Sequence, residues 1–182
     1  MHPVILVPAA RMDSSPTPAG PRPATRWRVR DVTTGDLPGL GWTGGHLHRD
    51  YIIGMLTLAG NGEADYLAVC GPDGGPDGLG AVEYTASSGV PWMCMVQVSP
   101  QAQGRGAATA LITALEHRAR ARGYLQVELG VEPDNVRADR LYRHLGYEQV
   151  RTERRSWQEA GPGGPPVTRN VTVLVLRKLL AR

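Results

Sequence analysis

A short loop with two glycines joins an extended apolar segment to an amphipathic helix, and this junction constrains the fold more than any other part of the chain. The extended segment covers residues 93–98, and Gly104 and Gly106 stand at the mouth of the helix that follows. Over residues 106–122 the apolar positions recur every three or four residues, as on one buried helix face: Ala108, Leu111, Ile112, Leu115 and Ala119. A strand that leads through a tight turn into a helix favours an α/β fold.

The chemistry of this junction points to an anion. A helix N-terminus exposes unpaired backbone N–H groups at the positive end of the helix dipole, and glycine allows phosphate oxygens to approach these groups closely. The loop has no GKS or GKT sequence of a P-loop, and it lacks the third glycine and downstream acid of a dinucleotide fingerprint. We therefore predict a phosphate-binding loop of another kind.

Other elements can be read on both sides of this junction. Period-two patterns and turn residues predict further strands, and the glycine- and proline-rich residues 71–78 predict a hairpin between two of them. A second helix, ended by Gly146, has its apolar positions at Ala138, Leu141 and Leu145. The expected strands are residues 27–30, 65–70, 79–85, 91–98, 125–131, 147–157 and 170–177, and a helix is expected over 50–58.

Length and composition indicate one folded domain behind a tail. Residues 1–24 are rich in proline and small residues, so they bury little, and we predict a flexible proline-rich N-terminal tail there. A chain of 182 residues is within the usual size of one domain, which we place at residues 25–182.

The cysteines and charges exclude several classes of protein. Cys70 and Cys94 have neither CxxC spacing nor a histidine cluster beside them, so we expect no metal, no disulfide and a reducing, cytoplasmic location. The formal net charge is +3, but the basic residues are scattered, which argues against nucleic acid as a partner. No apolar run approaches the roughly 20 residues of a membrane-spanning helix, and none has the form of a signal peptide.

Two segments carry a resemblance to a known family. Residues 103–108, Gln-Gly-Arg-Gly-Ala-Ala, resemble the Q/R-x-x-G-x-G/A segment of the GNAT superfamily of N-acetyltransferases. Residues 135–147 resemble that family's N-x-x-A-x-x-L-Y-x-x-x-G-F/Y helix, and the order of elements from about residue 92 to 147 is also that of the family. The resemblance implies a mixed α/β (α+β) fold with a mostly antiparallel sheet of six or seven strands, splayed at its centre and flanked by helices.

The same resemblance implies an acetyl-CoA site between the splayed strands 93–98 and 125–131. Backbone groups of residues 96–98 would pair with the pantetheine arm, and those of residues 104–109 would hold the pyrophosphate, with Arg105 adding charge. Asn135 would contact the cofactor arm. The implied cofactor-binding residues are Val96, Gln97, Val98, Gln103, Gly104, Arg105, Gly106, Ala107, Ala108, Thr109, Asn135 and Tyr142.

The implied reaction is direct attack of a neutral amine on the thioester. Tyr142 is the candidate acid for the departing thiolate, and the alternative is a core tyrosine on an apolar helix face. Glu128 and Glu83 are the candidate bases, acting directly or through water, but both could equally be solvent-facing strand residues. A water chain without a dedicated base stays open as well.

The function that follows is an acetyl-CoA-dependent N-acetyltransferase for a primary amine, with a non-catalytic acyl-CoA sensor or interaction domain as the alternative. The acceptor is left open among a protein N-terminus, a lysine, a polyamine, an amino acid and an aminoglycoside-like antibiotic. Residues 33–62 are expected to decide it, and a homodimer, common among similar proteins, is also left open. Core packing is the favoured role for Cys94. It is also favoured for the aromatic residues, which could alternatively line an acceptor pocket: Trp42, Tyr51, Tyr66, Tyr84 and Trp92. For three arginines a solvated helix face is favoured over a site for the 3′-phosphate of the cofactor: Arg118, Arg120 and Arg122.

Overall fold

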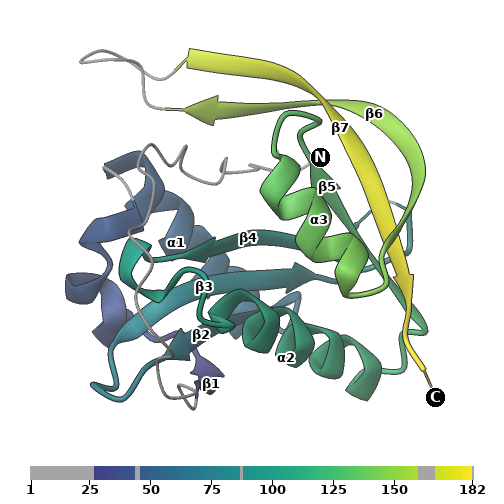
Figure 1. The fold of residues 1–182 in the computed structure, drawn as a ribbon. Coiled ribbons are helices and arrows are strands. Elements are labelled where there is room, and N and C mark those ends of the chain that lie inside the picture. Colours follow the sequence, from purple (N-terminus) through teal and green to yellow (C-terminus); the bar gives the residue numbers. More distant parts are fainter. Residues whose placement is uncertain (1–26, 44–45, 87, 160–166, 182) are drawn as a thin grey trace.

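A computed structural model describes residues 27–43, 46–86, 88–159 and 167–181 of the chain (Figure 1). The proline-rich residues 1–24, predicted to be a flexible tail, lie outside the described residues.

Seven strands form one sheet in the order β1-β2-β3-β4-β5-β7-β6. All neighbouring strands are antiparallel except β4 and β5, which are parallel. The strands are β1 (Arg28–Asp31), β2 (Ala64–Cys70), β3 (Pro76–Glu83), β4 (Trp92–Val98), β5 (Gln126–Val131), β6 (Glu148–Glu159) and β7 (Val167–Leu179). This confirms the predicted mixed, mostly antiparallel sheet.

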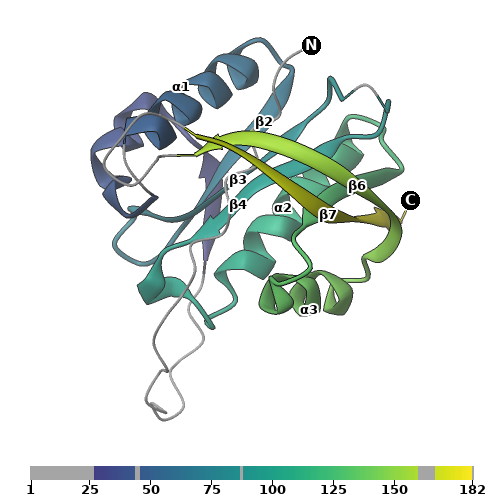
Figure 2. The same cartoon turned by 90° about the horizontal axis from the view of Figure 1, so that it is seen from above.

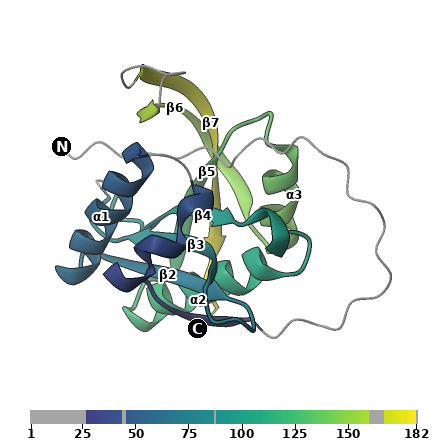
Figure 3. The same ribbon diagram turned by 90° about the vertical axis from the view of Figure 1, so that its left-hand side faces the viewer.

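Helices cover both faces of the sheet. Helix α1 (His46–Gly60) lies on one face, and α2 (Ala107–Ala121) and α3 (Val136–His144) lie on the other (Figures 2 and 3). Each face has its own apolar cluster, because side chains of a strand alternate between the faces. Trp92 of β4 packs in the α1 cluster and the next residue, Met93, packs in the α2 cluster. The sheet is therefore a shared middle layer between two cores.

Several elements are longer than the sequence patterns predict. Helix α1 begins at His46 and continues through Gly54, where an added Cβ would meet nothing within 4 Å, so this glycine lies on an uncrowded part of the helix surface. Strands β6 and β7 pair continuously from Glu148↔Arg177 to Glu159↔Val167, apart from one register shift. This pairing explains why β7 begins at Val167 and not at residue 170, as the sequence predicts. Contacts with β6 stabilise the extended backbone of residues 167–169 more than their own strand propensity does.

Parallel pairing between β4 and β5 is very short. Within these two fully described strands it is limited to Trp92↔Glu128 and Met93↔Leu129. Beyond that point β4 continues beside β3, and β5 continues beside β7. The sheet is thus splayed at its centre, as the resemblance implies, and the splay opens next to the loop that carries the two glycines.

Candidate active site

A β-bulge in β4 starts the splay. Leu79 of β3 faces Gln97 and Ala81 faces Cys94, so Gly80 alone faces two residues of β4, Met95 and Val96. Met95 has a φ of 55°, and it packs in the α1 cluster together with its neighbour Cys94 instead of alternating with it. Because the bulge bends β4, the strand parts from β5 beyond Met93. The sequence did not predict this bulge, because its residue with a left-handed backbone is Met95 and not a glycine.

The open edge of β4 consists of residues that the resemblance assigns to the cofactor. Val96, Gln97 and Val98 are half-buried and pair with β3 on one side, whereas β5 has diverged on the other. The amide Nε2 of Gln97 is buried and has no hydrogen-bond partner among the described residues. Unpaired polar groups in such a place are costly unless a ligand or solvent satisfies them. The assignment of this edge to the pantetheine arm therefore stays a prediction that the geometry favours.

The glycine loop ends at the N-terminus of α2. Gly104 and Gly106 have φ values of 68° and 84°, in the left-handed region where L side chains are strained, and Gly106 is the N-cap of the helix. The N–H groups of the first turn, from Ala107 to Thr109, have no intrahelical acceptor. They form the end of the helix at which the sequence predicts that an anion binds.

Hydrogen bonds and a cation–π contact hold this loop in place. The Nε2 group of Gln103 donates to the Val98 carbonyl over 3.2 Å, and Arg137 of α3 donates to Gln103 Oε1 over 3.2 Å. The indole Nε1 of Trp27 donates to the Arg105 carbonyl over 2.8 Å, and the Arg105 guanidinium lies 5.7 Å from the centroid of that ring. Gln103 therefore links β4 to α3 through its side-chain amide. Trp27 stabilises the loop through the Arg105 carbonyl, a role that the sequence analysis did not predict.

Asn135 and Tyr142 lie at the two ends of α3. Asn135 is its N-cap, with Oδ1 accepting from the Ala138 N–H over 3.2 Å. A contact to a cofactor arm would use the Nδ2–H groups or the second lone pair of Oδ1. The ring of Tyr142 is 8% exposed and packs edge to face on Tyr147 at 5.7 Å. Burial, with a smaller effect from Cys94, raises the pKa of Tyr142 well above its ordinary value, so the phenol keeps its proton at neutral pH.

The structure argues against Glu128 as the base. Its side chain is fully buried, and Oε1 accepts from Arg177 at 2.6 Å and 2.9 Å. Arg151 Nη1 lies 2.8 Å from Oε2, an ion pair whose angle is outside hydrogen-bond geometry. Two guanidinium groups stabilise the ionised carboxylate, and they occupy the oxygens that a base would need. Glu128 thus joins β5 to β6 and β7.

Glu83, the other candidate, lies on the opposite side of Trp92 from Glu128. It is half-buried at the end of β3, paired with Trp92 across the strands. The thiol of Cys94 donates to Glu83 Oε1 over 3.3 Å. Burial is the main cause that raises the pKa of Cys94 well above its ordinary value, and the Glu83 charge adds to it. Cys94 is therefore a protonated, buried thiol, in agreement with the packing prediction.

The remaining candidates divide into two groups. Trp42 donates to the Pro76 carbonyl and Tyr84 donates to Asp65, so these two rings have structural partners. Arg118 and Arg122 also pair with aspartates of β1 and β2. By contrast, two aromatic side chains on the α1 face have buried polar atoms without a partner among the described residues, Tyr66 OH and Trp92 Nε1, whereas the Tyr51 hydroxyl lies beside the Cys94 thiol.

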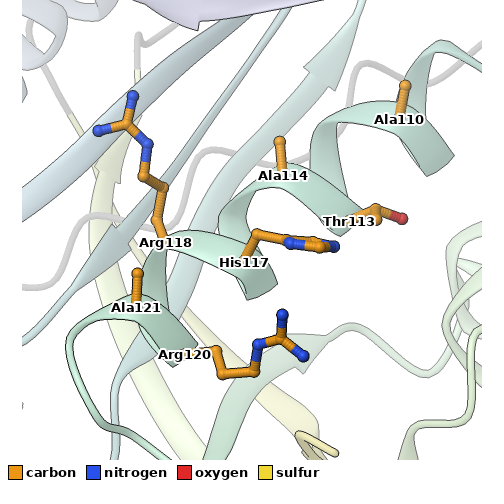
Figure 4. A pocket seen from close by; sticks show the side chains of 7 residues that line it. All are labelled: Ala110, Thr113, Ala114, His117, Arg118, Arg120 and Ala121. Carbon is orange, nitrogen blue, oxygen red and sulfur yellow. The ribbon is translucent and has the colours of Figure 1, made fainter.

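A surface depression lies elsewhere, on the outer face of α2 (Figure 4). All residues that line it belong to this one helix: Ala110, Thr113, Ala114, His117, Arg118, Arg120 and Ala121. It contains none of the catalytic or cofactor-binding residues that the resemblance implies, although it includes Arg118 and Arg120, the alternative 3′-phosphate site, and it is open to solvent over one helix face. The splay between β4 and β5, together with the N-terminus of α2, is therefore the better candidate for chemistry.

Two properties of the described residues bear on partners. None of their helices combines the length and the apolar character needed to cross a membrane. The described part of the chain also contains no group of three or more His, Cys, Asp or Glu residues arranged to hold a metal ion.

Curated relatives match a limited part of the chain. The mycothiol acetyltransferase of Saccharomonospora viridis is 48% identical over 59 residues, which is 32% of this chain and 19% of that protein. The mycothiol acetyltransferase of Beutenbergia cavernae is 49% identical over 53 residues, which is 29% of this chain and 18% of that protein. The chain thus spans less than a fifth of the length of these relatives.

Solved structures share the fold over most of the chain. The phosphinothricin acetyltransferase of Sinorhizobium meliloti, in complex with acetyl-CoA, superposes with a TM-score of 0.64 at 19% identity, over 85% of this chain and 88% of that one. The PaiA N-acetyltransferase of Thermoplasma acidophilum, in complex with coenzyme A, gives 0.62 at 11% identity, over 85% and 99%. The sequence model of the acetyltransferase (GNAT) family matches residues 10–147, which is most of the chain, and the chain therefore belongs to that family.

Proposed function

We propose that this protein transfers the acetyl group of acetyl-CoA to a primary amine by direct attack on the thioester. The observation that carries the proposal is the splay itself: β4 and β5 pair only at Trp92 and Met93, and the gap between them opens beside the N-terminus of α2. A thioester with a long pantetheine arm and a pyrophosphate suits a gap that has free strand edge along one side and free helix N–H groups at its end.

The chain's own residues fit this co-substrate in three respects. The N–H groups of residues 107–109 would receive the pyrophosphate oxygens, and the left-handed Gly106 leaves no Cβ in their way. The open edge of residues 96–98 would pair with the amide groups of the pantetheine arm. The buried Nε2 of Gln97, which has no partner among the described residues, is a further donor next to this edge.

Proton transfer would use Tyr142 and Glu83. Attack by the amine leaves a thiolate, which needs a proton, and Tyr142 is a neutral phenol whose O–H can donate a hydrogen bond to the sulfur as its charge develops. Glu83 is the favoured base of the two carboxylates, because Glu128 is occupied by two arginines. A water between Glu83 and the amine would serve the same purpose, so the direct and the water-mediated routes share one residue.

The competing function is acyl-CoA binding without turnover, and Tyr142→Phe distinguishes the two. If Tyr142 is the acid, the substitution lowers kcat by roughly 10²-fold, within the usual range for a general acid, while the affinity for acetyl-CoA is unchanged. The measurement is thiol release with a panel of primary amines, beside calorimetry for affinity. Cofactor binding by the unmodified protein with no thiol release from any amine would favour the sensor and contradict the enzyme.

A further inference from the structure

Groups of opposite charge flank one buried tryptophan on the α1 face of the sheet. Strand register places Glu83 beside Trp92, since the two residues are cross-strand partners and point to the same face. The guanidinium carbon of Arg155 lies 3.7 Å from the centroid of the Trp92 ring, so a cation covers the same indole. Trp92 therefore has a carboxylate at its side and a guanidinium on its face.

The thiol of Cys94 lies between these charges. It donates to Glu83, and the charge of Arg155 acts on it in the opposite sense to that of Glu83. Tyr66, Ala81 and Cys94 form one cross-strand row through their paired positions on β2, β3 and β4. Tyr142 is also within electrostatic reach of Cys94. These side chains consequently border the region where the splay meets the α1 face.

Unpartnered polar atoms concentrate around this row. Trp92 is 2% exposed and Tyr66 is 1% exposed, yet neither the indole N–H nor the phenol has a hydrogen-bond partner among the described residues. The hydroxyl of Tyr51 on α1 lies beside the thiol of Cys94, which borders the same row. Each buried polar group without a partner costs free energy, and such groups on one face of a sheet are typical of a site that a polar ligand completes.

Arg155 is fixed in place but retains donors. Its Nε and Nη2 groups bond to one oxygen of Glu153, and a guanidinium has further N–H groups beyond that edge. Glu153 in turn pairs with Arg151, and Arg151 pairs with Glu128. With Arg177 also on Glu128, this cluster has three arginines against two glutamates, so it is suited to one additional anion.

We propose that the acceptor is an amino-acid-like zwitterion, whose ammonium group lies beside Glu83 and Cys94 and whose anionic group binds Arg155. This proposal rests on the function proposed above and names the class of its amine. A polyamine or an aminoglycoside, which carries several positive charges, would place a cation against Arg155 and is disfavoured.

The reaction balances with this acceptor. The ammonium group first gives one proton to Glu83 or to a water beside it. The neutral nitrogen then forms a bond to the acetyl carbon while the carbon–sulfur bond breaks. The thiolate takes a proton from Tyr142, and the second nitrogen proton restores the phenol of Tyr142 directly or through solvent, while the proton on Glu83 passes to solvent. The products are an N-acetylated amino acid, free CoA and one proton released to solvent.

The test compares free amino acids with their carboxamides, which keep the amine and remove the negative charge. At saturating acetyl-CoA, we expect kcat/KM for the best free acid to exceed that of its amide by roughly 10- to 100-fold, the value of one charge-assisted hydrogen-bonded pair. In Arg155→Met this ratio should fall close to one, mainly through a higher KM. The matched control is Arg154→Met, because Arg154 is the exposed neighbour on the opposite face of β6.

A binding readout separates failure of this proposal from failure of the proposed function. Calorimetry of acid and amide in the presence of CoA measures acceptor binding without turnover, and a thermal melt of each variant checks folding. Preferential binding of the acid that Arg155→Met removes, and Arg154→Met retains, supports the anionic subsite. Turnover in which acids and amides are equal, or a polyamine as the best acceptor, would overturn it while leaving acetyl transfer intact.

Discussion

Gly106 and Gly123 stand at opposite ends of α2 and share a left-handed backbone, with φ values of 84° and 89°. An added Cβ at Gly106 would come no nearer than 3.9 Å to Trp27 Nε1, and at Gly123 it would meet nothing within 4 Å. Neither alanine would collide with a neighbour, so strain of the backbone is the main cost, about 1 kcal/mol at each position. Gly106→Ala and Gly123→Ala should therefore each lower Tm by about 2–4 °C.

The two variants should differ in cofactor affinity. Only Gly106 lies where the proposed pyrophosphate approaches the first turn of the helix, and a methyl group or a shifted loop there would weaken one or two charge-assisted hydrogen bonds. We expect the Kd for acetyl-CoA to rise by roughly 10- to 100-fold in Gly106→Ala. In Gly123→Ala, at the far end of α2, the Kd should be unchanged.

Calorimetric titration of both variants with acetyl-CoA, beside thermal melts, provides the comparison. Equal weakening in the two proteins would mean that general destabilisation, not the loop, controls affinity. An unchanged Kd in Gly106→Ala would refute the assignment of the pyrophosphate to this helix end.

Three further predictions concern the support of the glycine loop, the arginines on Glu128 and an ion pair of the edge strand β1. Trp27→Phe removes the 2.8 Å hydrogen bond to the Arg105 carbonyl but keeps an aromatic ring. Calorimetry should therefore show the Kd for acetyl-CoA raised by roughly 2- to 10-fold. An unchanged Kd would mean that Trp27 does not support the loop. Glu128→Gln leaves two arginines without their carboxylate, so the free energy of unfolding measured in urea should fall by about 3–5 kcal/mol. A variant that keeps its full stability but loses turnover would instead favour Glu128 as the base. Arg30 is the main cause that lowers the pKa of Asp36 to about 2 from 3.8, and hydrogen bonds from Thr33 add to it. These contacts should contribute roughly 2 kcal/mol above pH 4, which is lost as the pH falls through 2. Arg30→Met should remove most of that dependence in acid-unfolding curves, and an unchanged curve would contradict it.

Much of the fold could be predicted because local patterns carry it. The spacing of Leu111, Ile112 and Leu115 places α2, and all three side chains are fully buried on the sheet. The two glycines at the mouth of α2 predict its N-terminus, and both have the left-handed φ that only glycine adopts easily. Such signals lie within a few residues of the structure they determine.

The rest depends on contacts between distant parts of the chain. Glu83 and Glu128 are equivalent candidates in the sequence, since each is a polar residue in a strand. Strand register places both of them beside Trp92, and the difference comes from the next strand: Glu128 lies opposite Arg177 of β7, 49 residues later, which holds its carboxylate. The bond from Trp27 to the Arg105 carbonyl likewise spans 78 residues and has no local signature.

The most direct test of the central claim is calorimetric titration of the protein with acetyl-CoA, with dephospho-CoA and ATP as controls. We predict saturable binding of one acetyl-CoA per chain at micromolar concentration, with ATP binding much more weakly because it lacks the pantetheine arm that pairs with β4. Absence of binding to folded protein would mean that the splay and the glycine loop have the family's form without its cofactor, and acetyl transfer would be contradicted.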